Sequence, residues 1–182
     1  DDGLLATCNP NPLDQQICRV TVSGETTLIT ETAGIHEANA NDSLMVIQHR
    51  SMDFNGVKTS FYKDNELRNE IPDHSETPNI TLNSFFHKTG ELDLETAILL
   101  PTDHNGETTL PVLLDPYGGP HAQRVRKARG LFGVSQWFAD QGFAVVITDG
   151  RGTPGRSPNF EREVYGDLAL SLIHISEPTR LV

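Results

Sequence analysis

A tyrosine in a turn rich in proline and glycine has the surroundings that most suggest chemistry. Tyr117 lies in Asp115–Pro120, "DPYGGP", directly after the apolar run Leu110–Leu114. Glycines allow close backbone approach and positive φ, while prolines restrict the flanks. A phenol held there can donate a hydrogen bond to a developing oxyanion, which typically contributes about 3–4 kcal/mol. The alternative is a tyrosine packed at a loop with its hydroxyl bonded to backbone, and composition leaves both open.

Ser135, Ser157 and His121 are the candidates for a nucleophile or its base, but none of the three has the setting that such a group needs. No G-x-S-x-G nucleophile elbow occurs in the sequence. Ser135 falls inside a predicted helix, where a nucleophile would be poorly presented, and Ser157 has no strained turn around it. We therefore interpret His121 as a loop residue rather than a general base.

A second glycine-rich turn, Asp149–Arg156, reads "DGRGTPGR". It lacks both G-x-x-x-x-G-K-[ST] and G-x-G-x-x-G, so a phosphate-binding loop is rejected. We interpret it as a tight strand-end turn in which Arg151 pairs with a nearby carboxylate. Asp115 and Asp149 are likewise expected to tie the two turns rather than to form a catalytic pair.

The elements around the two turns predict the beginning of an α/β sheet. Apolar strands are predicted at Leu110–Leu114 and Phe143–Thr148, with a helix over Gly130–Gly142 between them. Strand, helix, strand is the crossover unit of a parallel sheet. The first strand is nearly continuous in apolar residues, which predicts burial on both faces. Both turns lie at carboxyl ends of strands, where open sheets place their active sites.

The first part of the chain has a different pattern, with short strands separated by turn residues. This spacing favours an antiparallel sandwich, barrel or propeller. A polar linker follows at Pro72–Thr81, and then two strands around Thr89–Gly90. The strands predicted before the linker are 3–8, 15–22, 26–31, 44–51, 57–63 and 66–71.

Composition excludes some functions. The 182 residues hold 14 Lys and Arg against 25 Asp and Glu, a net charge of −11, which argues against a nucleic-acid partner. No run is long enough to cross a membrane. A soluble protein is expected, with the cytoplasm slightly favoured over export.

The two cysteines, Cys8 and Cys18, lie in neighbouring predicted strands. Reduced, half-buried thiols are the expectation, and a cross-strand disulfide is the alternative if the protein is exported. Because no histidines stand at metal-binding spacing, no metal site is expected, and no motif predicts a cofactor.

We interpret the last residues of the chain as foreign to the natural protein. Leu170–Arg180 matches the in-frame translation of a transposase sequencing adapter. Residues 170–182 are therefore expected to be foreign, and the natural protein is expected to continue past Ala169.

Three segments, "LPVLLDPYGGPHAQ", "SQWFADQGFAVVITDGRGTPGR" and "FEREVYGDLA", together resemble the prolyl oligopeptidase family of serine peptidases. The branch that they resemble is that of bacterial dipeptidyl peptidase IV-like enzymes. The resemblance is strong over 110–169 and weaker over 1–101.

The resemblance implies a fold that combines β with α/β structure. Residues 1–71 would be the end of a β-propeller, and 72–169 the start of an α/β-hydrolase domain that the chain holds only in part. Tyr117 would be the oxyanion-hole tyrosine of a peptidase that acts on peptides and forms an acyl-enzyme. The family's Ser, Asp and His would follow the end of this chain, so the chain alone is expected to be inactive. A homo-oligomer is also compatible with the family.

Two other functions stay open. One is a propeller-containing binding protein with an inactive hydrolase-like domain, and the other is an α/β-hydrolase that acts on esters. Within the peptidase reading, exopeptidase and endopeptidase specificity are both open.

Overall fold

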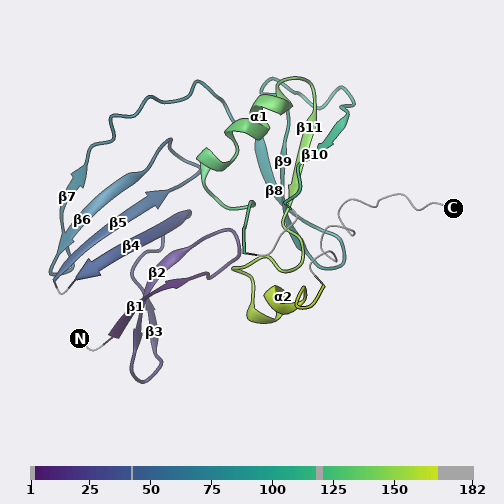
Figure 1. Ribbon diagram of the computed structural model, residues 1–182. Helices are drawn as coiled ribbons and strands as arrows, with labels where there is room; N and C mark the ends of the chain where they lie inside the picture. Colours follow the sequence, from purple (N-terminus) through teal and green to yellow (C-terminus); the bar gives the residue numbers. More distant parts are fainter. Residues whose placement is uncertain (1–2, 42, 118–120, 168–182) are drawn as a thin grey trace. The chain divides into compact units, whose positions relative to one another are not determined.

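The computed structural model describes residues 3–41, 43–117 and 121–167, and the chain divides into two compact units (Figure 1). Unit 1 extends to Asn79 and also contains Arg126–Gly130; unit 2 runs from Ile80 to Val125 and resumes at Leu131. The structure is mostly β, with three open sheets and few helices. The predicted adapter residues, 170–182, lie outside the described part of the chain. The division into propeller and hydrolase domains at residues 71 and 72 stays a prediction.

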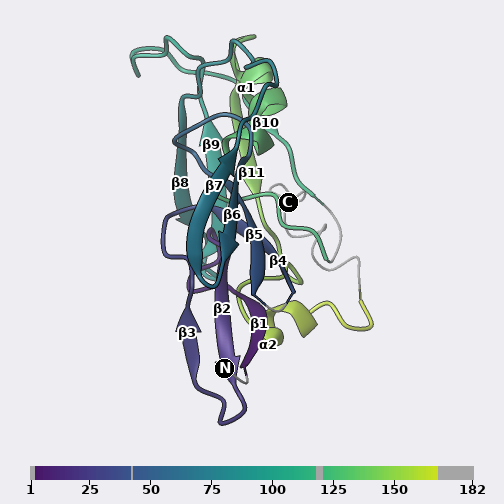
Figure 2. The same cartoon turned by 90° about the vertical axis from the view of Figure 1, so that its left-hand side faces the viewer.

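Unit 1 contains two antiparallel sheets (Figure 2). One has three strands in the order β1-β2-β3, and the other has four in the order β4-β5-β6-β7. Side chains that alternate along β5, Met45 and Ile47, are buried, as expected of a strand with one face toward a core. The strand bounds are β1 Gly3–Cys8, β2 Gln16–Thr21, β3 Thr26–Leu28, β4 Ile35–Asn41, β5 Leu44–Arg50, β6 Lys58–Lys63 and β7 Glu66–Ile71.

Every strand predicted in this unit is present, but β4 was missed. Its sequence, "IHEANAN", is largely polar because only Ile35 and His36 at its start are buried. The turn between β6 and β7 follows from local chemistry. Asp64 and Asn65 have φ of 54° and 63°, a left-handed conformation that these residue types tolerate in two-residue hairpins.

The expectation of reduced cysteines is wrong. Cys8 and Cys18 form a disulfide between the adjacent strands β1 and β2, with their Cα atoms 6.0 Å apart. The register pairs Cys18 with Ala6 and Cys8 with Gln16, so the two cysteines are diagonal neighbours. That separation lies in the range that a disulfide can bridge. The register of the β1–β2 pair brings the two thiols together, and this register cannot be inferred from composition.

Unit 2 is built on a mixed four-stranded sheet in the order β10-β11-β9-β8. β10 pairs with β11 in parallel, and the other pairs are antiparallel. The predicted parallel pair with a helix between its strands is therefore confirmed. The bounds are β8 Ser84–Thr89, β9 Leu94–Leu99, β10 Val112–Leu114, β11 Ala144–Thr148, α1 Gly133–Ala139 and α2 Pro158–Arg162, with a 3₁₀ turn, η1, at Arg129–Leu131.

The burial predicted for β10 is wrong. Val112 and Leu114 are 62% and 46% exposed, because β10 is an edge strand and β11 is its one neighbour among the strands of the described residues. The central strand β11 has the predicted character, and Val145 and Ile147 are fully buried. The helix is shorter than predicted and ends at Ala139. The chain then reverses through Gly142, whose φ of 99° suits glycine.

The linker predicted at Pro72–Thr81 contains no helix or strand. No helix among the described residues has both the length and the apolar character that a membrane span requires.

Candidate active site

Tyr117 lies in the loop that follows β10, and its side chain is accessible, with 41% exposure. The loop starts from the sheet itself, since the Asp115 amide donates to the Val146 carbonyl oxygen at 2.9 Å. The rest of the predicted "YGGP" turn, residues 118–120, lies outside the described residues. The structure thus places Tyr117 where the sequence predicted, just beyond the carboxyl end of a parallel strand.

Asp115 ties the beginning of this loop to its far end. Its carboxylate accepts two hydrogen bonds from the Arg124 guanidinium, at 2.9 and 2.7 Å, and one from Ser135 Oγ at 3.2 Å. The hydrogen bonds from Arg124 lower the pKa of Asp115, outweighing the opposite effect of burial. Asp115 is therefore a carboxylate engaged in holding the loop, as predicted.

Asp149 holds the same loop from the end of β11. This carboxylate is buried and accepts the backbone amides of Arg124 at 2.9 Å and Val125 at 3.0 Å. Burial raises the pKa of Asp149, although the two amides act in the opposite direction. The prediction that Asp115 and Asp149 tie turns is confirmed, because each bonds to the segment at Arg124.

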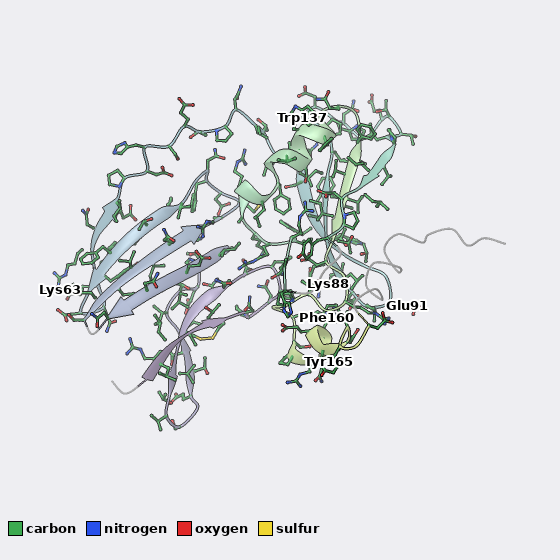
Figure 3. All side chains as sticks on the ribbon, in the orientation of Figure 1. Lys63, Lys88, Glu91, Trp137, Phe160 and Tyr165 are labelled. Atoms are coloured by element: carbon green, nitrogen blue, oxygen red, sulfur yellow. A yellow bond between two sulfur atoms is a disulfide. The ribbon has the colours of Figure 1, made fainter. Side chains whose placement is uncertain are left out.

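The "DGRG" turn packs against the segment of α2. The Gly152 amide donates to the Phe160 carbonyl oxygen at 3.2 Å, and Arg151 Nε lies 3.6 Å from Glu163 Oε2. Phe160, labelled in Figure 3, is buried on α2, and the Arg156 guanidinium lies over its ring. The predicted pairing of Arg151 with a carboxylate is confirmed.

Ser135, Ser157 and His121, the serine and histidine residues weighed as catalytic groups, have surroundings that do not suit that role. Ser135 is buried in α1 and donates to Asp115. Ser157 is the N-cap of α2, where its Oγ accepts the Phe160 amide at 3.2 Å. His121 has a side chain 80% exposed, with Nδ1 3.8 Å from Glu161 Oε1. These settings agree with the interpretation that none of the three is a nucleophile or its base.

Sequence reasoning missed two polar residues that organise this unit. Arg124 joins the two ends of the loop, and a single arginine nine residues after an aspartate carries no signal of that pairing. Gln136 is fully buried in α1, where its side chain accepts the Asn83 amide and donates to the Leu100 carbonyl oxygen, both at 2.9 Å. A polar residue on the helical line of Phe132 and Ala139 is the signal that indicates such a role.

A further set of contacts was also missed, in the part of the loop region that belongs to unit 1. We call Arg126–Gly130 the strap. Lys127 Nζ donates to Asp14 Oδ2 at 2.7 Å, and the Lys127 amide donates to the Leu13 carbonyl oxygen at 2.9 Å. Arg126 Nη2 donates to Gln15 Oε1 at 2.7 Å, and Arg129 Nε donates to Asn55 Oδ1 at 2.8 Å.

Part of the chain is similar in sequence to known peptidases. No family model matches the chain. It is 36% identical over 70 residues to the uncharacterized peptidase YuxL of Bacillus subtilis strain 168, which is 38% of this chain and 10% of that protein. It is 29% identical over 80 residues to human prolyl endopeptidase FAP, and 28% identical over 83 residues to the mouse protein. These matches cover 44% and 46% of this chain and 10% and 11% of those proteins.

Solved structures show the same fold over most of the chain. Dipeptidyl peptidase 4 of Porphyromonas gingivalis superposes with a TM-score of 0.76 at 19% identity, over 95% of this chain and 28% of that one. The acylaminoacyl peptidase of Pyrococcus horikoshii gives a TM-score of 0.63 at 19% identity, over 89% and 26%.

Both of these solved structures are of peptidases. The resemblance of the chain to peptidases of the prolyl oligopeptidase family, including dipeptidyl peptidase 4, is confirmed. The sequence matches span about a tenth of the curated relatives, and the chain spans about a quarter of the solved ones.

Proposed function

We propose that this chain is part of a serine peptidase that cleaves peptides after proline or similar small residues, and that Tyr117 stabilises the oxyanion. The observation that carries the proposal is the position of Tyr117, exposed just beyond the carboxyl end of β10 in a loop tied to β11. Active sites of open α/β sheets occupy this place. The similarity to two prolyl endopeptidases and to a dipeptidyl peptidase supports the substrate class.

The proposed reaction is acyl transfer through a covalent intermediate. A serine hydroxyl attacks the carbonyl carbon of the scissile amide while a histidine takes the hydroxyl proton. The carbonyl oxygen gains the negative charge, and the Tyr117 hydroxyl donates a hydrogen bond to it. Collapse of the intermediate gives the proton to the leaving amine and leaves an acyl-enzyme, which water hydrolyses. By family resemblance, the serine, aspartate and histidine follow the segment described above.

The loop contacts have a defined part in this scheme. An oxyanion donor is effective when it is held in place before the reaction, because it then needs no reorganisation as charge develops. Asp115 and Arg124 close the loop with two hydrogen bonds, and Asp149 fixes two successive amides at its far end. These contacts restrain the backbone on which Tyr117 stands.

Two alternatives make different predictions about the full-length protein. A propeller-containing binding protein with an inactive hydrolase-like domain would hydrolyse neither amides nor esters. An esterase of the α/β-hydrolase type would cleave ester substrates and leave proline-containing amides intact. A chromogenic proline dipeptide amide and the matching ester, assayed in parallel on the full-length gene product, separate the three functions.

The Tyr117→Phe variant of the full-length protein tests the assigned role. It removes one hydroxyl and little volume, so we expect kcat to fall by about 10²-fold while KM changes little. Tyr165→Phe is the matched control, because Tyr165 is 93% exposed in the same unit and is expected to leave kcat unchanged (Figure 3). A kcat of Tyr117→Phe within a few-fold of wild type, with a lower unfolding midpoint, would mean that Tyr117 only packs in its loop.

A further inference from the structure

Every polar atom of Asp115, the first residue after β10, is hydrogen-bonded within unit 2. The Asp115 amide donates to the Val146 carbonyl oxygen at 2.9 Å, and the Asp115 carbonyl oxygen accepts Arg124 Nη1 at 3.5 Å. The two carboxylate oxygens accept the Arg124 guanidinium, and Oδ2 also accepts Ser135 Oγ. Both the backbone and the side chain of Asp115 therefore have fixed positions in this unit.

The fixed position of Asp115 is passed on to Tyr117 through a proline. Tyr117 follows Asp115 by two residues, and Pro116 lies between them. The ring of Pro116 fixes its own φ, and steric contact with that ring also restricts the backbone of the preceding residue. Little rotational freedom then remains between Asp115 and the Cα atom of Tyr117. The direction in which Tyr117 leaves the sheet is therefore set from the β10 side of the loop.

Ser135 contributes to this arrangement from α1. It is 2% exposed, and its hydroxyl donates to Asp115 Oδ2 at 3.2 Å. A serine inside a helix can bond to a carbonyl of the preceding turn, whereas this contact reaches a residue 20 positions earlier. The helix is itself fixed, because the buried Gln136 side chain bonds to backbone groups of Asn83 and Leu100. The Ser135 hydroxyl is therefore a donor in a fixed place.

We propose that Ser135 is a positioning residue for Tyr117. Its hydroxyl orients the Asp115 carboxylate for the Arg124 guanidinium. Asp115 in turn fixes the backbone that continues to Tyr117. The inference rests on the proposed oxyanion role of Tyr117, and all of these residues belong to the described part of unit 2. Small displacements of a reacting group lower rates strongly even when their cause is remote from the chemistry.

The test compares Ser135→Ala with Ser157→Ala in the full-length protein. Each variant removes one hydroxyl that makes a hydrogen bond of 3.2 Å in unit 2, and the hydrogen bond of Ser157 lies in the cap of α2. We expect kcat of Ser135→Ala to fall about tenfold with KM unchanged, because the placement of the oxyanion donor changes. Ser157→Ala should keep the wild-type kcat. A wild-type kcat in Ser135→Ala, or an equal fall in both variants, would overturn the proposal.

A double-mutant cycle with Asp115→Ala tests whether Ser135 acts through Asp115. Substitutions within one hydrogen-bonded network are not additive. Ser135→Ala should therefore change kcat by less than about twofold when Asp115 is already alanine. A further tenfold loss in that background would mean that Ser135 acts by another route, and the positioning role would be refuted.

Amide hydrogen exchange provides a readout that needs no turnover. The Asp115 and Ala144 amides donate across the β10–β11 pair near its two ends, both at 2.9 Å. In Ser135→Ala, faster exchange at Asp115 with Ala144 unchanged supports the anchoring. Unchanged exchange at Asp115, or faster exchange at both amides, would contradict it. A normal kcat in Tyr117→Phe would instead refute the proposed function, and the exchange at Asp115 would still decide whether Ser135 fixes the start of the loop.

Discussion

The guanidinium of Arg124 holds both carboxylate oxygens of Asp115, with Nη1 2.9 Å from Oδ1 and Nη2 2.7 Å from Oδ2. Asp115 begins the loop after β10. The backbone amide of Arg124, near the other end of this loop, donates to the Asp149 carboxylate, which directly follows β11. One ion pair therefore closes the loop that carries Tyr117.

Replacing Arg124 with lysine should open this closure. A lysine ammonium cannot make two parallel hydrogen bonds to a carboxylate, so Arg124→Lys is not conservative here. We expect a loss of about 1 kcal/mol in the free energy of unfolding, because the pair is partly exposed. Urea unfolding of wild type and variant measures the loss. Arg68→Lys is the control, because Arg68 and Glu66 form an exposed pair; equal losses in the two variants would contradict the prediction.

The Cys8–Cys18 disulfide should stabilise unit 1. It closes a loop with a sequence separation of 10 residues, for which restriction of the unfolded chain predicts about 2–3 kcal/mol. We expect reduction, or the Cys8→Ser and Cys18→Ser double variant, to lower the denaturant midpoint. Thiol labelling of denatured, unreduced protein should find no free cysteine. Two labelled thiols in protein purified without reductant would show that the pair does not form.

His36 should make the fold sensitive to mild acid. Its ring stacks on His49 with 4.0 Å between centroids, and its two nitrogens face the Gln15 carbonyl oxygen and Thr32 Oγ1. Burial lowers the pKa of His36, and the neighbouring His49 lowers it further, while the hydrogen bond with the Gln15 carbonyl oxygen and the charge of Asp14 act in the opposite direction.

Because the folded pKa of His36 is below the unfolded value, protonation favours the unfolded chain. The contribution of neutral His36 to the free energy of unfolding should therefore be fully present above the unfolded pKa, about 6.5, and should decrease as the pH falls below that value. Urea unfolding at pH 7.5 and pH 5.5 measures the change, and His36→Gln should reduce it. The same pH dependence in wild type and His36→Gln would assign it to other groups.

The 182-residue chain by itself should not hydrolyse peptides. Ser135 is buried and bonded to Asp115, and Ser157 caps α2, so neither presents a nucleophile. We expect a chromogenic proline dipeptide amide to remain intact above the rate of a blank preparation. Turnover that persists in the Ser135→Ala and Ser157→Ala double variant would show that another group in this chain is the nucleophile.

Much of the local structure could be predicted because its causes are local. The turn at Asp64 and Asn65 follows from residues that tolerate positive φ, and β11 follows from a continuous apolar run. The position of Tyr117 beyond β10 also follows from its neighbours in the sequence, which are an apolar strand and then turn-forming residues. β4 could not be predicted in this way, because its polar sequence has little of the apolar alternation that marks a strand.

The sequence by itself determined the parallel pair, the tyrosine loop after β10 and the roles of Asp115 and Asp149 as ties. Tertiary structure decided which partners these groups have. Asp14 meets Lys127 across 113 residues, and Cys8 meets Cys18 through the register of two strands. The same holds for β10, whose exposure depends on its place at the sheet edge rather than on its apolar sequence. Such pairings arise when sheets assemble and bury charge or surface together, and no periodicity in the chain encodes them.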